Sequence, residues 1–283
     1  MTTSTSQQQA ETLHRLHQDG KPLVLVNAWD AASARVLEQA GASVIATTSA
    51  GMAWSLGHAD GEKLPRNELI AACARICRVV RVPVTVDIER GFGRNTDEVC
   101  SLVRALIDLG VVGVNIEDGV APETRRLLPA QALCEHVGAL RALAEQANVR
   151  LFINARTDVY LATHDQPARR FEEAMERARL FAAAGADGIF VPGMDQLDEI
   201  TRFARALEPP LNVYAGYPGV PAIDALAAAG VRRVSLGCGP LQSALGLLGR
   251  IAAEAFTLGR YDAMARDMVA ASDLNRLFAP RVA

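Results

Sequence analysis

One phrase recurs along the chain and restricts the folds open to it. A helical stretch ends in small residues and a glycine, and a short strand rich in β-branched residues follows. Glycine is common directly after a helix because it adopts a left-handed backbone at no steric cost, and a strand of about five residues is of ordinary length. The phrase reads LEQAGASVIAT at 37–47, LIDLGVVGVNI at 106–116, FAAAGADGIFV at 181–191 and LAAAGVRRVSL at 226–236, and its glycines are Gly41, Gly110, Gly185 and Gly230.

Four further apolar segments, at 23–27, 83–87, 151–155 and 211–215, read as strands without that preface. Apolar strands that alternate with helices indicate a parallel sheet covered by helices. Eight such units over roughly 250 residues predict a (β/α)8 barrel, and a doubly wound sheet is the alternative. The helices are expected at 31–40, 67–80, 96–109, 130–147, 168–184, 195–206 and 221–229.

The whole chain, residues 1–283, is expected to form a single barrel domain, because its length is ordinary for one barrel. Residues 1–20 are polar and read as an N-terminal extension. After the last strand, residues from about 240 to 283 contain two further helices, which exceed the needs of a barrel. We expect them to pack on a neighbouring subunit or to close one end of the barrel.

The composition excludes several classes of partner. The 29 basic and 32 acidic residues give a net charge of -3, so no nucleic-acid partner is expected. The polar N-terminus lacks the apolar core of a secretory signal, and no apolar run is long enough to cross a membrane. Five cysteines, an odd and sparse set, suit a reducing cytoplasm.

Acidic residues gather where two neighbouring strands end. Asp87 and Glu89 follow the third strand, and Glu117 follows the fourth. Chemistry in such barrels lies at the carboxyl ends of the strands, and carboxylates that converge without cations repel one another. The set therefore predicts a Mg²⁺ site, with Mn²⁺ as a second possibility, since these ions prefer oxygen ligands. The alternative is a set of simple ion pairs between these glutamates and Arg90, Arg94 or Arg156.

Two further features suit an anionic substrate. Arg156, after the fifth strand, has a fork that matches both oxygens of a carboxylate, although a salt bridge to Asp158 or Glu117 is the alternative. The TTSAG loop at 47–51, which includes Thr48, offers hydroxyl and backbone N–H groups that can hold an anion.

With these residues in place, the chain resembles the isocitrate lyase / phosphoenolpyruvate mutase superfamily over about residues 20–280. The resemblance rests on the blocks NAWDAASARVLEQAGASVIATTSAG, SLGHADGEKLP, VPVTVDIERGFG, VNIEDG, INARTD and GVRRVSLG. It implies a (β/α)8 barrel with a helix swapped between subunits, in a homodimer or homotetramer.

The resemblance also implies a set of site residues. Asp87 would bind Mg²⁺ directly, while Glu89, Asp60 and Glu117 would hold its waters. A small carboxylate substrate would then lie against the carboxylate-binding loop, the arginine and the pocket wall, that is, against Ser49, Ala50, Gly51, Arg156 and Asn212.

The chain departs from the named enzymes of that superfamily at one loop. Lyases for isocitrate or methylisocitrate carry a Lys-(Lys/Arg)-Cys-Gly-His loop after the fourth strand. Here the segment reads GVAPETRRLLPAQ, with neither cysteine nor histidine, and the asparagine of the phosphonomutase gating loop is also missing. The CEH sequence at 134–136 lies in a helical stretch that we expect outside the barrel.

These features predict a Mg²⁺-dependent lyase or decarboxylase that acts on a small 2-oxo or 2-hydroxy dicarboxylate through an enolate. Arg156, Glu117 and Tyr214 are the residues expected to act in catalysis, and Tyr214, His58 or a water on the metal are candidates for the proton donor. Two alternatives stay open. One is an enzyme for P–C bonds in phosphonates, and the other is a family member that binds dicarboxylates with little activity.

Overall fold

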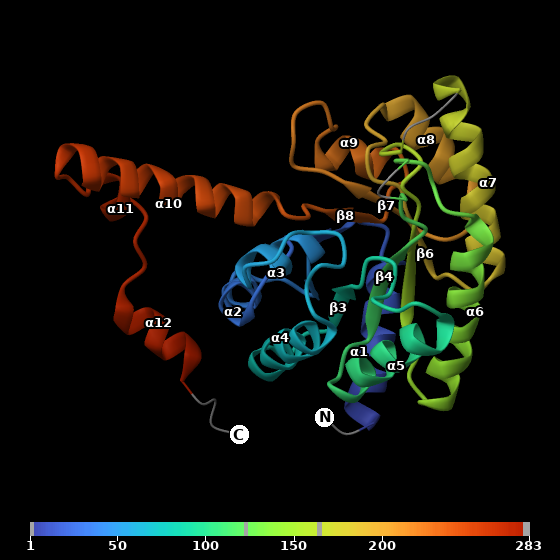
Figure 1. Ribbon diagram of the computed structural model, residues 1–283, viewed down its shortest axis with the longest axis horizontal. Helices are drawn as coiled ribbons and strands as arrows, with labels where there is room; N and C mark the ends of the chain where they lie inside the picture. The colour runs from blue at the N-terminus through green and yellow to red at the C-terminus, as the bar shows by residue number, and fades with distance from the viewer. Residues whose placement is uncertain (1–2, 122–123, 163–165, 280–283) are drawn as a thin grey trace.

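The computed structural model describes residues 3–121, 124–162 and 166–279 and contains a barrel of eight parallel strands (Figure 1). The strands lie in the order β1-β8-β7-β6-β5-β4-β3-β2. An isolated parallel bridge between Ala28 and Thr47 links the two ends of this sheet. The (β/α)8 prediction is therefore confirmed, because a doubly wound sheet would not pair its first strand with its last.

Most elements match the ranges expected from the periodicity, with shorter strands at several positions, and a short helix at 49–55 replaces part of the expected loop. The strands are β1 (Leu23–Leu25), β2 (Ile45–Ala46), β3 (Val84–Asp87), β4 (Gly113–Glu117), β5 (Phe152–Arg156), β6 (Gly188–Phe190), β7 (Leu211–Tyr214) and β8 (Arg233–Ser235). The helices are α1 (Thr3–Leu16), α2 (Ala31–Gln39), α3 (Ser49–Ser55), α4 (Arg66–Val79), α5 (Thr96–Asp108), α6 (Ala130–Gln146), a 3₁₀ turn (Pro167–Arg169), α7 (Arg170–Ala183), α8 (Leu197–Ala206), α9 (Ile223–Ala228), α10 (Gly239–Leu258), α11 (Asp262–Ala265) and α12 (Ala271–Phe278).

Local sequence accounts for the ends of these helices. Asp30 begins α2 with a capping box, in which its carboxylate accepts from the Ser33 N–H while the Ser33 hydroxyl oxygen accepts from the Asp30 N–H. The glycines of the repeated phrase all have a left-handed backbone two residues after a helix ends, as expected. They are Gly41, Gly110, Gly185 and Gly230, with φ of 101°, 96°, 108° and 97°.

The apolar core lies between the strands and the surrounding helices. Outward-facing residues of neighbouring strands, such as Val86, Val114 and Ile153, are fully buried against the helical layer. Successive side chains of a strand point to opposite faces, so the residues between them face the inside of the barrel. On the central strands those inward residues are Thr85, Asn115, Asn154, Asn212 and Arg233, each at most 5% exposed.

The segment expected as a polar extension forms helix α1, apart from residues 1–2, which lie outside the described part. Helix α1 packs beneath the barrel, at the amino-terminal ends of the strands (Figure 1). Leu13 is fully buried, and the ring of His17, just after the helix, stacks on Phe152 at a centroid distance of 4.0 Å. Gly113 of β4 leaves room for this contact, since a Cβ there would lie 2.9 Å from the Leu13 side chain.

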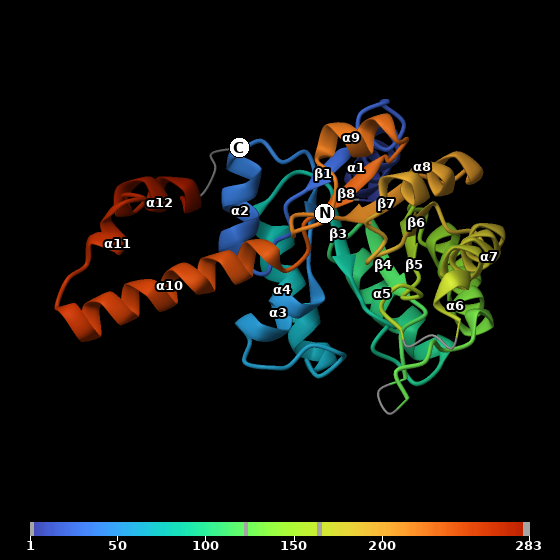
Figure 2. The same cartoon turned by 90° about the horizontal axis from the view of Figure 1, so that it is seen from above.

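The C-terminal segment forms an arm of three helices, where the sequence indicated two. Helix α10 runs away from the barrel, and α11 and α12 fold back beside it (Figures 1 and 2). The arm returns to the body at α2, where Arg35 Nε donates to the Leu277 carbonyl oxygen over 3.1 Å. Residues 280–283 lie outside the described part. Among the described helices, none combines the length and the apolar character needed to span a bilayer.

Candidate active site

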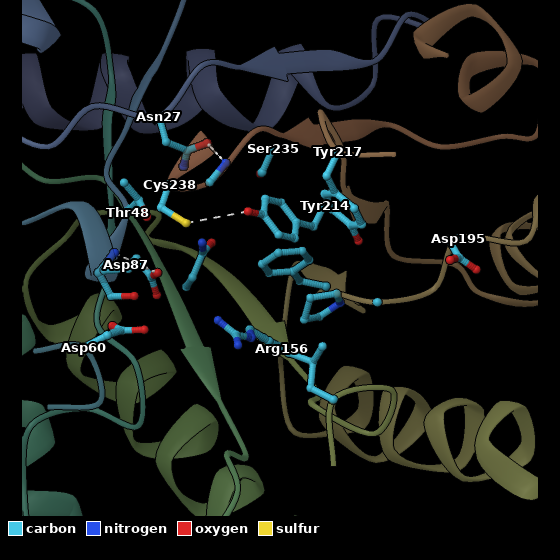
Figure 3. Close-up of a pocket in the computed structure, with 18 residues that line it drawn as sticks. Asn27, Thr48, Asp60, Asp87, Arg156, Asp195, Tyr214, Tyr217, Ser235 and Cys238 are labelled. Atoms are coloured by element: carbon cyan, nitrogen blue, oxygen red, sulfur yellow. Dashed lines mark hydrogen bonds between the residues drawn. The ribbon is translucent and has the colours of Figure 1, made fainter. Parts of the chain in front are cut away.

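A cavity of about 570 Å³ opens at the carboxyl ends of the strands. Figure 3 shows Asp60 and Asp87 together on one side, Arg156 to the right of Asp60, and Tyr214 and Tyr217 facing the acids from the other side. This is the end of the barrel at which the sequence places the chemistry. The cavity contains seven of the residues predicted for the site, namely Thr48, Ser49, Ala50, Asp60, Asp87, Arg156 and Tyr214.

The acidic corner is formed by Asp87, Asp60 and Glu89. Asp87 ends β3, and its carboxylate accepts from the Ser49 N–H over 3.2 Å. Burial and the charges of Asp87 and Asp60 raise the pKa of Glu89 to about 8. Burial and the charge of Asp87 likewise raise the pKa of Asp60. The corner therefore holds carboxyl groups that repel one another when they are charged, and a bound cation would relieve this repulsion.

A loop after α3 brings Asp60 to this corner. Glu62 holds the loop in place, because its N–H donates to Glu89 over 2.7 Å and its carboxylate accepts from the Phe92 N–H and from Arg90, over 2.7 and 2.6 Å. The backbone after β3 turns sharply here, with φ of 48° at Glu89 and 110° at Gly91. A Cβ at Gly91 would lie 2.6 Å from the Val99 side chain, so only glycine fits the turn.

Arg156 and Glu117 end neighbouring strands and face each other in register. Arg156 Nη1 lies 2.9 Å from Glu117 Oε2, and Arg156 Nε donates to Asp158 over 2.6 Å. Burial alone would lower the pKa of Arg156, but the charges of Glu117, Asp158 and Asp87 raise it above its usual value. The pKa of Glu117 is also raised, chiefly by burial, and Arg156 opposes this shift. Both ion pairs named as the alternative role of Arg156 are thus formed in the ligand-free protein.

Asp118 anchors the loop after β5 instead of facing the cavity. Its carboxylate accepts from the Thr157 hydroxyl over 2.7 Å, from the Asp158 N–H over 2.9 Å and from Arg177 over 3.0 Å. Burial raises its pKa to about 6, while these donors oppose the rise. Asp118 therefore fixes Asp158, which in turn orients Arg156.

Two tyrosines stand opposite the acids, and the hydroxyl of one of them points toward a cysteine (Figure 3). The hydroxyl oxygen of Tyr214 lies 3.7 Å from Cys238 Sγ, and the Tyr214 and Tyr217 rings are 4.9 Å apart (Figure 3). Burial and the contact with Cys238 raise the pKa of Tyr214, so its hydroxyl stays protonated at neutral pH. Asn27 holds the cysteine loop, because its side-chain oxygen accepts from the Gly237 N–H over 2.8 Å.

The TTSAG loop enters α3 directly, with Thr48 as its N-cap residue. Ser49 and Ala50 line the cavity. Gly51 lies behind them, where a Cβ would be 2.6 Å from the Thr48 side chain, so a larger residue would displace the loop. The first turn of a helix presents backbone N–H groups, which favour an anion at this wall.

The donors at the acidic corner fit Mg²⁺ better than a metal held only by protein. No group of three or more His, Cys, Asp or Glu side chains in the described ranges converges closely enough to enclose an ion. Mg²⁺ usually keeps several waters and is held by one or two carboxylates. Asp87 and Asp60 line the cavity, and burial and the charges of these two acids raise the pKa of Glu89 behind them. The residues therefore fit this ion, with Asp87 and Asp60 nearest the cavity.

The remaining predicted residues lie near the cavity without lining it. Glu89 and Glu117 stand behind the acids and Arg156. Asn212 is fully buried, and its side-chain oxygen accepts from the Ser235 hydroxyl over 3.1 Å. It lies one layer deeper than expected, because Tyr214, two residues later on the same face of β7, forms the wall. His58 pairs with Glu68 at 3.4 Å, away from the acids.

Several cavity residues were not predicted. Asn115, Phe190 and Ser235 could have been found from strand alternation, since each lies two residues from another inward-facing position. Asn27 ends the first predicted strand and could have been found from that position. Tyr217 and Cys238 also line the cavity, and nothing in the sequence marks them.

The loop after β4 that lacks the lyase signature forms a small hairpin. Val120 and Leu127 pair in an antiparallel bridge, and Ala121 N–H donates to the Arg126 carbonyl oxygen over 2.8 Å. Residues 122–123 of this loop lie outside the described part. The CEH sequence lies on α6, where Cys134 and His136 are partly exposed on the outer layer, as expected.

Comparisons with known proteins agree with this geometry. The family model described as phosphoenolpyruvate phosphomutase matches residues 13–256. The 2-methylisocitrate lyase of Aeropyrum pernix is 33% identical over 191 residues, which are 67% of this chain and 60% of that enzyme.

Solved structures give the same answer for the fold. A Burkholderia cenocepacia J2315 protein, provisionally described as a lyase/mutase, is 33% identical with a TM-score of 0.88, and 98% of each chain is covered. A phosphonopyruvate hydrolase in complex with oxalate and Mg²⁺ is 22% identical with a TM-score of 0.81, over 95% of this chain and 94% of that one.

Proposed function

Because the chain belongs to the phosphoenolpyruvate phosphomutase family, in the superfamily that its motifs resemble, we propose that it is a Mg²⁺-dependent lyase or decarboxylase. Its substrate would be a small 2-oxo or 2-hydroxy dicarboxylate, cleaved through an enolate. One observation carries the proposal: two acids and a buried arginine line a single cavity. The A. pernix relative, a lyase, supports the same reaction class.

Arg156 binds a carboxylate of the substrate in this proposal. Its guanidinium is held by Asp158 over 2.6 Å on one side and lies 2.9 Å from Glu117 on the other. A substrate carboxylate would take up the remaining N–H groups of the fork. Asp158 cannot swing away, since its N–H donates to Asp118 over 2.9 Å. Arg156 is therefore preorganised before the substrate arrives.

The acidic corner would hold the cation through Asp87 and Asp60, with Glu89 and Glu117 accepting from its waters. When bound, Mg²⁺ supplies a Lewis acid for the negative charge that develops as the C–C bond breaks. The backbone N–H of Ser49 keeps Asp87 pointed into the cavity. Thr48 also lines the cavity, and its hydroxyl would donate to a second carboxylate group of the substrate.

Tyr214 is the residue we propose as proton donor. Its hydroxyl lies on the wall opposite the acids, and its raised pKa keeps it protonated at neutral pH. It would deliver its proton to the carbon that bore the broken bond, and the resulting phenolate would recover a proton from solvent. Tyr214 would thus take the place of the loop cysteine that acts in acid/base chemistry in the isocitrate and methylisocitrate lyases and that this chain lacks.

Calorimetry and a substrate panel test the proposal. Oxalate mimics a pyruvate enolate, so the protein should bind oxalate in the presence of Mg²⁺ and release pyruvate or glyoxylate from at least one C4–C7 dicarboxylate. Asp87→Asn should abolish both signals. Asp195→Asn is the matched control, because Asp195 lines the same cavity on the far side from the acids (Figure 3).

The other outcomes are also informative. Turnover of phosphonopyruvate, with silence across the dicarboxylates, would establish P–C chemistry instead. Oxalate binding without turnover of any candidate would indicate a binding protein. An absence of oxalate binding with either Mg²⁺ or Mn²⁺ would reject the proposed site.

We further propose that the arm α10–α12 packs on a second copy of the chain, in a dimer or tetramer. Large apolar side chains on the arm are exposed in the single chain. Isolated apolar side chains are normal on a surface, but a row along a projecting helix indicates an interface. The most exposed are Leu248 (59%), Phe256 (87%), Leu258 (67%), Tyr261 (68%) and Met268 (66%).

A further inference from the structure

The inside of the barrel directly beneath the cavity is polar. Asn115, Asn154, Asn212 and Arg233 come from four different strands and are each at most 5% exposed. Such layers are usually filled by Val, Ile and Leu, because a buried polar group is destabilising unless it is hydrogen-bonded. A polar layer at this depth therefore calls for a role other than packing.

Arg233 is the most unusual member of the layer. It is 1% exposed, and no carboxylate in the described ranges lies within ion-pair distance of it. Its Nη2 donates to Asn115 Oδ1 over 3.0 Å, whereas Nε and Nη1 lack a partner among the described residues. Burial lowers its pKa to about 9, partly offset by the charge of Asp87. A cation in this setting strongly favours any acceptor that reaches it.

Arg233 fixes which way the Asn115 amide points. A guanidinium can only donate, so the Asn115 oxygen must face it. The same oxygen also accepts from Asn154 Nδ2 over 2.9 Å, which fills both of its lone pairs. Asn115 lines the cavity, and its amide nitrogen is the polar atom left to face it. The charge-assisted bond at Oδ1 also strengthens the amide as a donor.

We propose that Asn115 Nδ2 is a donor at the floor of the cavity that binds a carboxylate or carbonyl oxygen of the substrate, and that Arg233 is the residue that positions it. The inference rests on the proposed function only in taking the ligand to be a small carboxylate. The floor would select for an oxygen at this position and against a methyl or ammonium group, which cannot accept a hydrogen bond.

Calorimetry with oxalate and Mg²⁺ tests the donor. Asn115→Ala should weaken oxalate binding on the order of ten- to a hundred-fold, as expected for a lost hydrogen bond to a charged group. Thr85→Val is the matched control. Thr85 lies in the same buried layer without lining the cavity, so this variant should bind oxalate as the wild type does.

A double-mutant cycle tests the positioning role. Arg233→Met should weaken oxalate binding in the wild type and have no further effect in Asn115→Ala, since Arg233 acts through that side chain. If Arg233→Met does not fold, Asn154→Ala takes its place, because Asn154 donates to the same oxygen. A purely structural role would lower the melting temperature and leave the oxalate affinity unchanged.

Three results would overturn the inference. Wild-type affinity in Asn115→Ala would remove the floor donor. Additive effects of the two substitutions would remove the positioning role of Arg233. A wild type that does not bind oxalate at all would reject the proposed function and this inference together, whereas the first two results would leave the proposed function intact.

Discussion

His17, beneath the barrel, should make the stability of the protein depend on pH in a way that one substitution removes. The side chain is 4% exposed, its ring stacks on Phe152, and its Nδ1 lies 2.8 Å from the Leu13 carbonyl oxygen. Burial, and then the charge of Arg233 above it, lower the pKa of His17 from 6.5 to about 3, with a smaller contribution from His14. His17 is therefore neutral in the folded protein between pH 5 and pH 7.

The sign and size of the effect follow from linkage. Between about pH 6.5 and pH 3 the unfolded chain binds a proton at His17 that the folded protein does not. Stability from this group is complete above the unfolded pKa and is lost as the pH falls. On going from pH 7 to pH 5, the pH falls about 1.5 units below the unfolded pKa of His17, which corresponds to a loss of about 2 kcal/mol in the free energy of unfolding.

His17→Phe keeps the aromatic stack and removes the titrating group. We expect the free energy of unfolding of the wild type to fall more steeply between pH 7 and pH 5 than that of the variant, by about 2 kcal/mol. Urea titrations followed by circular dichroism at both pH values measure this double difference, in which the other titrating groups cancel. Equal losses in the two proteins would refute the reasoning, because His17 would then have no shifted pKa.

Two other predictions concern the site and the arm. Tyr214→Phe should lower kcat for the substrate found in the panel by on the order of 10²–10⁴-fold, while the affinity for oxalate stays within about threefold. Tyr217→Phe, which changes the neighbouring ring, should retain most activity. An unchanged kcat in Tyr214→Phe would exclude Tyr214 as the proton donor. Leu248→Glu combined with Phe256→Glu should give a monomer in light scattering with a folded circular dichroism spectrum, and a wild type that is itself monomeric would show that the arm has no partner.

The fold could be predicted from the sequence because the pattern that specifies it is local. Each helix that ends at a glycine leads into a buried parallel strand, and the chain repeats this unit often enough for only one closed arrangement to fit. The clustering of the acids could be predicted for the same reason, since the carboxyl ends of β3 and β4 must lie side by side. The sequence alone therefore places Asp87 and Arg156 near one cavity.

Other features depend on contacts that sequence does not encode locally. Helix α1 buries only a few apolar side chains, such as Ala10 and Leu13, and otherwise packs through His14 and His17, so its polar sequence resembled an extension. Arg232 and Arg233 are adjacent, and only the register of β8 decides that Arg233 turns inward. The sequence could not decide whether Arg156 forms its ion pairs, because this depends on the distances between side chains on neighbouring strands.

The polar layer inside the barrel has an evolutionary consequence. Exchanging a buried polar network for well-packed apolar side chains of similar volume is often neutral or stabilising. Replacement of the whole layer, Arg233 included, by apolar side chains would therefore tend to raise the melting temperature while removing the floor donor, whereas Val or Leu at Asn115 alone would leave Arg233 buried without a hydrogen-bond partner. A laboratory lineage selected for heat resistance alone would drift toward a robust barrel that has lost one of its contacts to the substrate. Persistence of the layer through such drift requires selection on function itself.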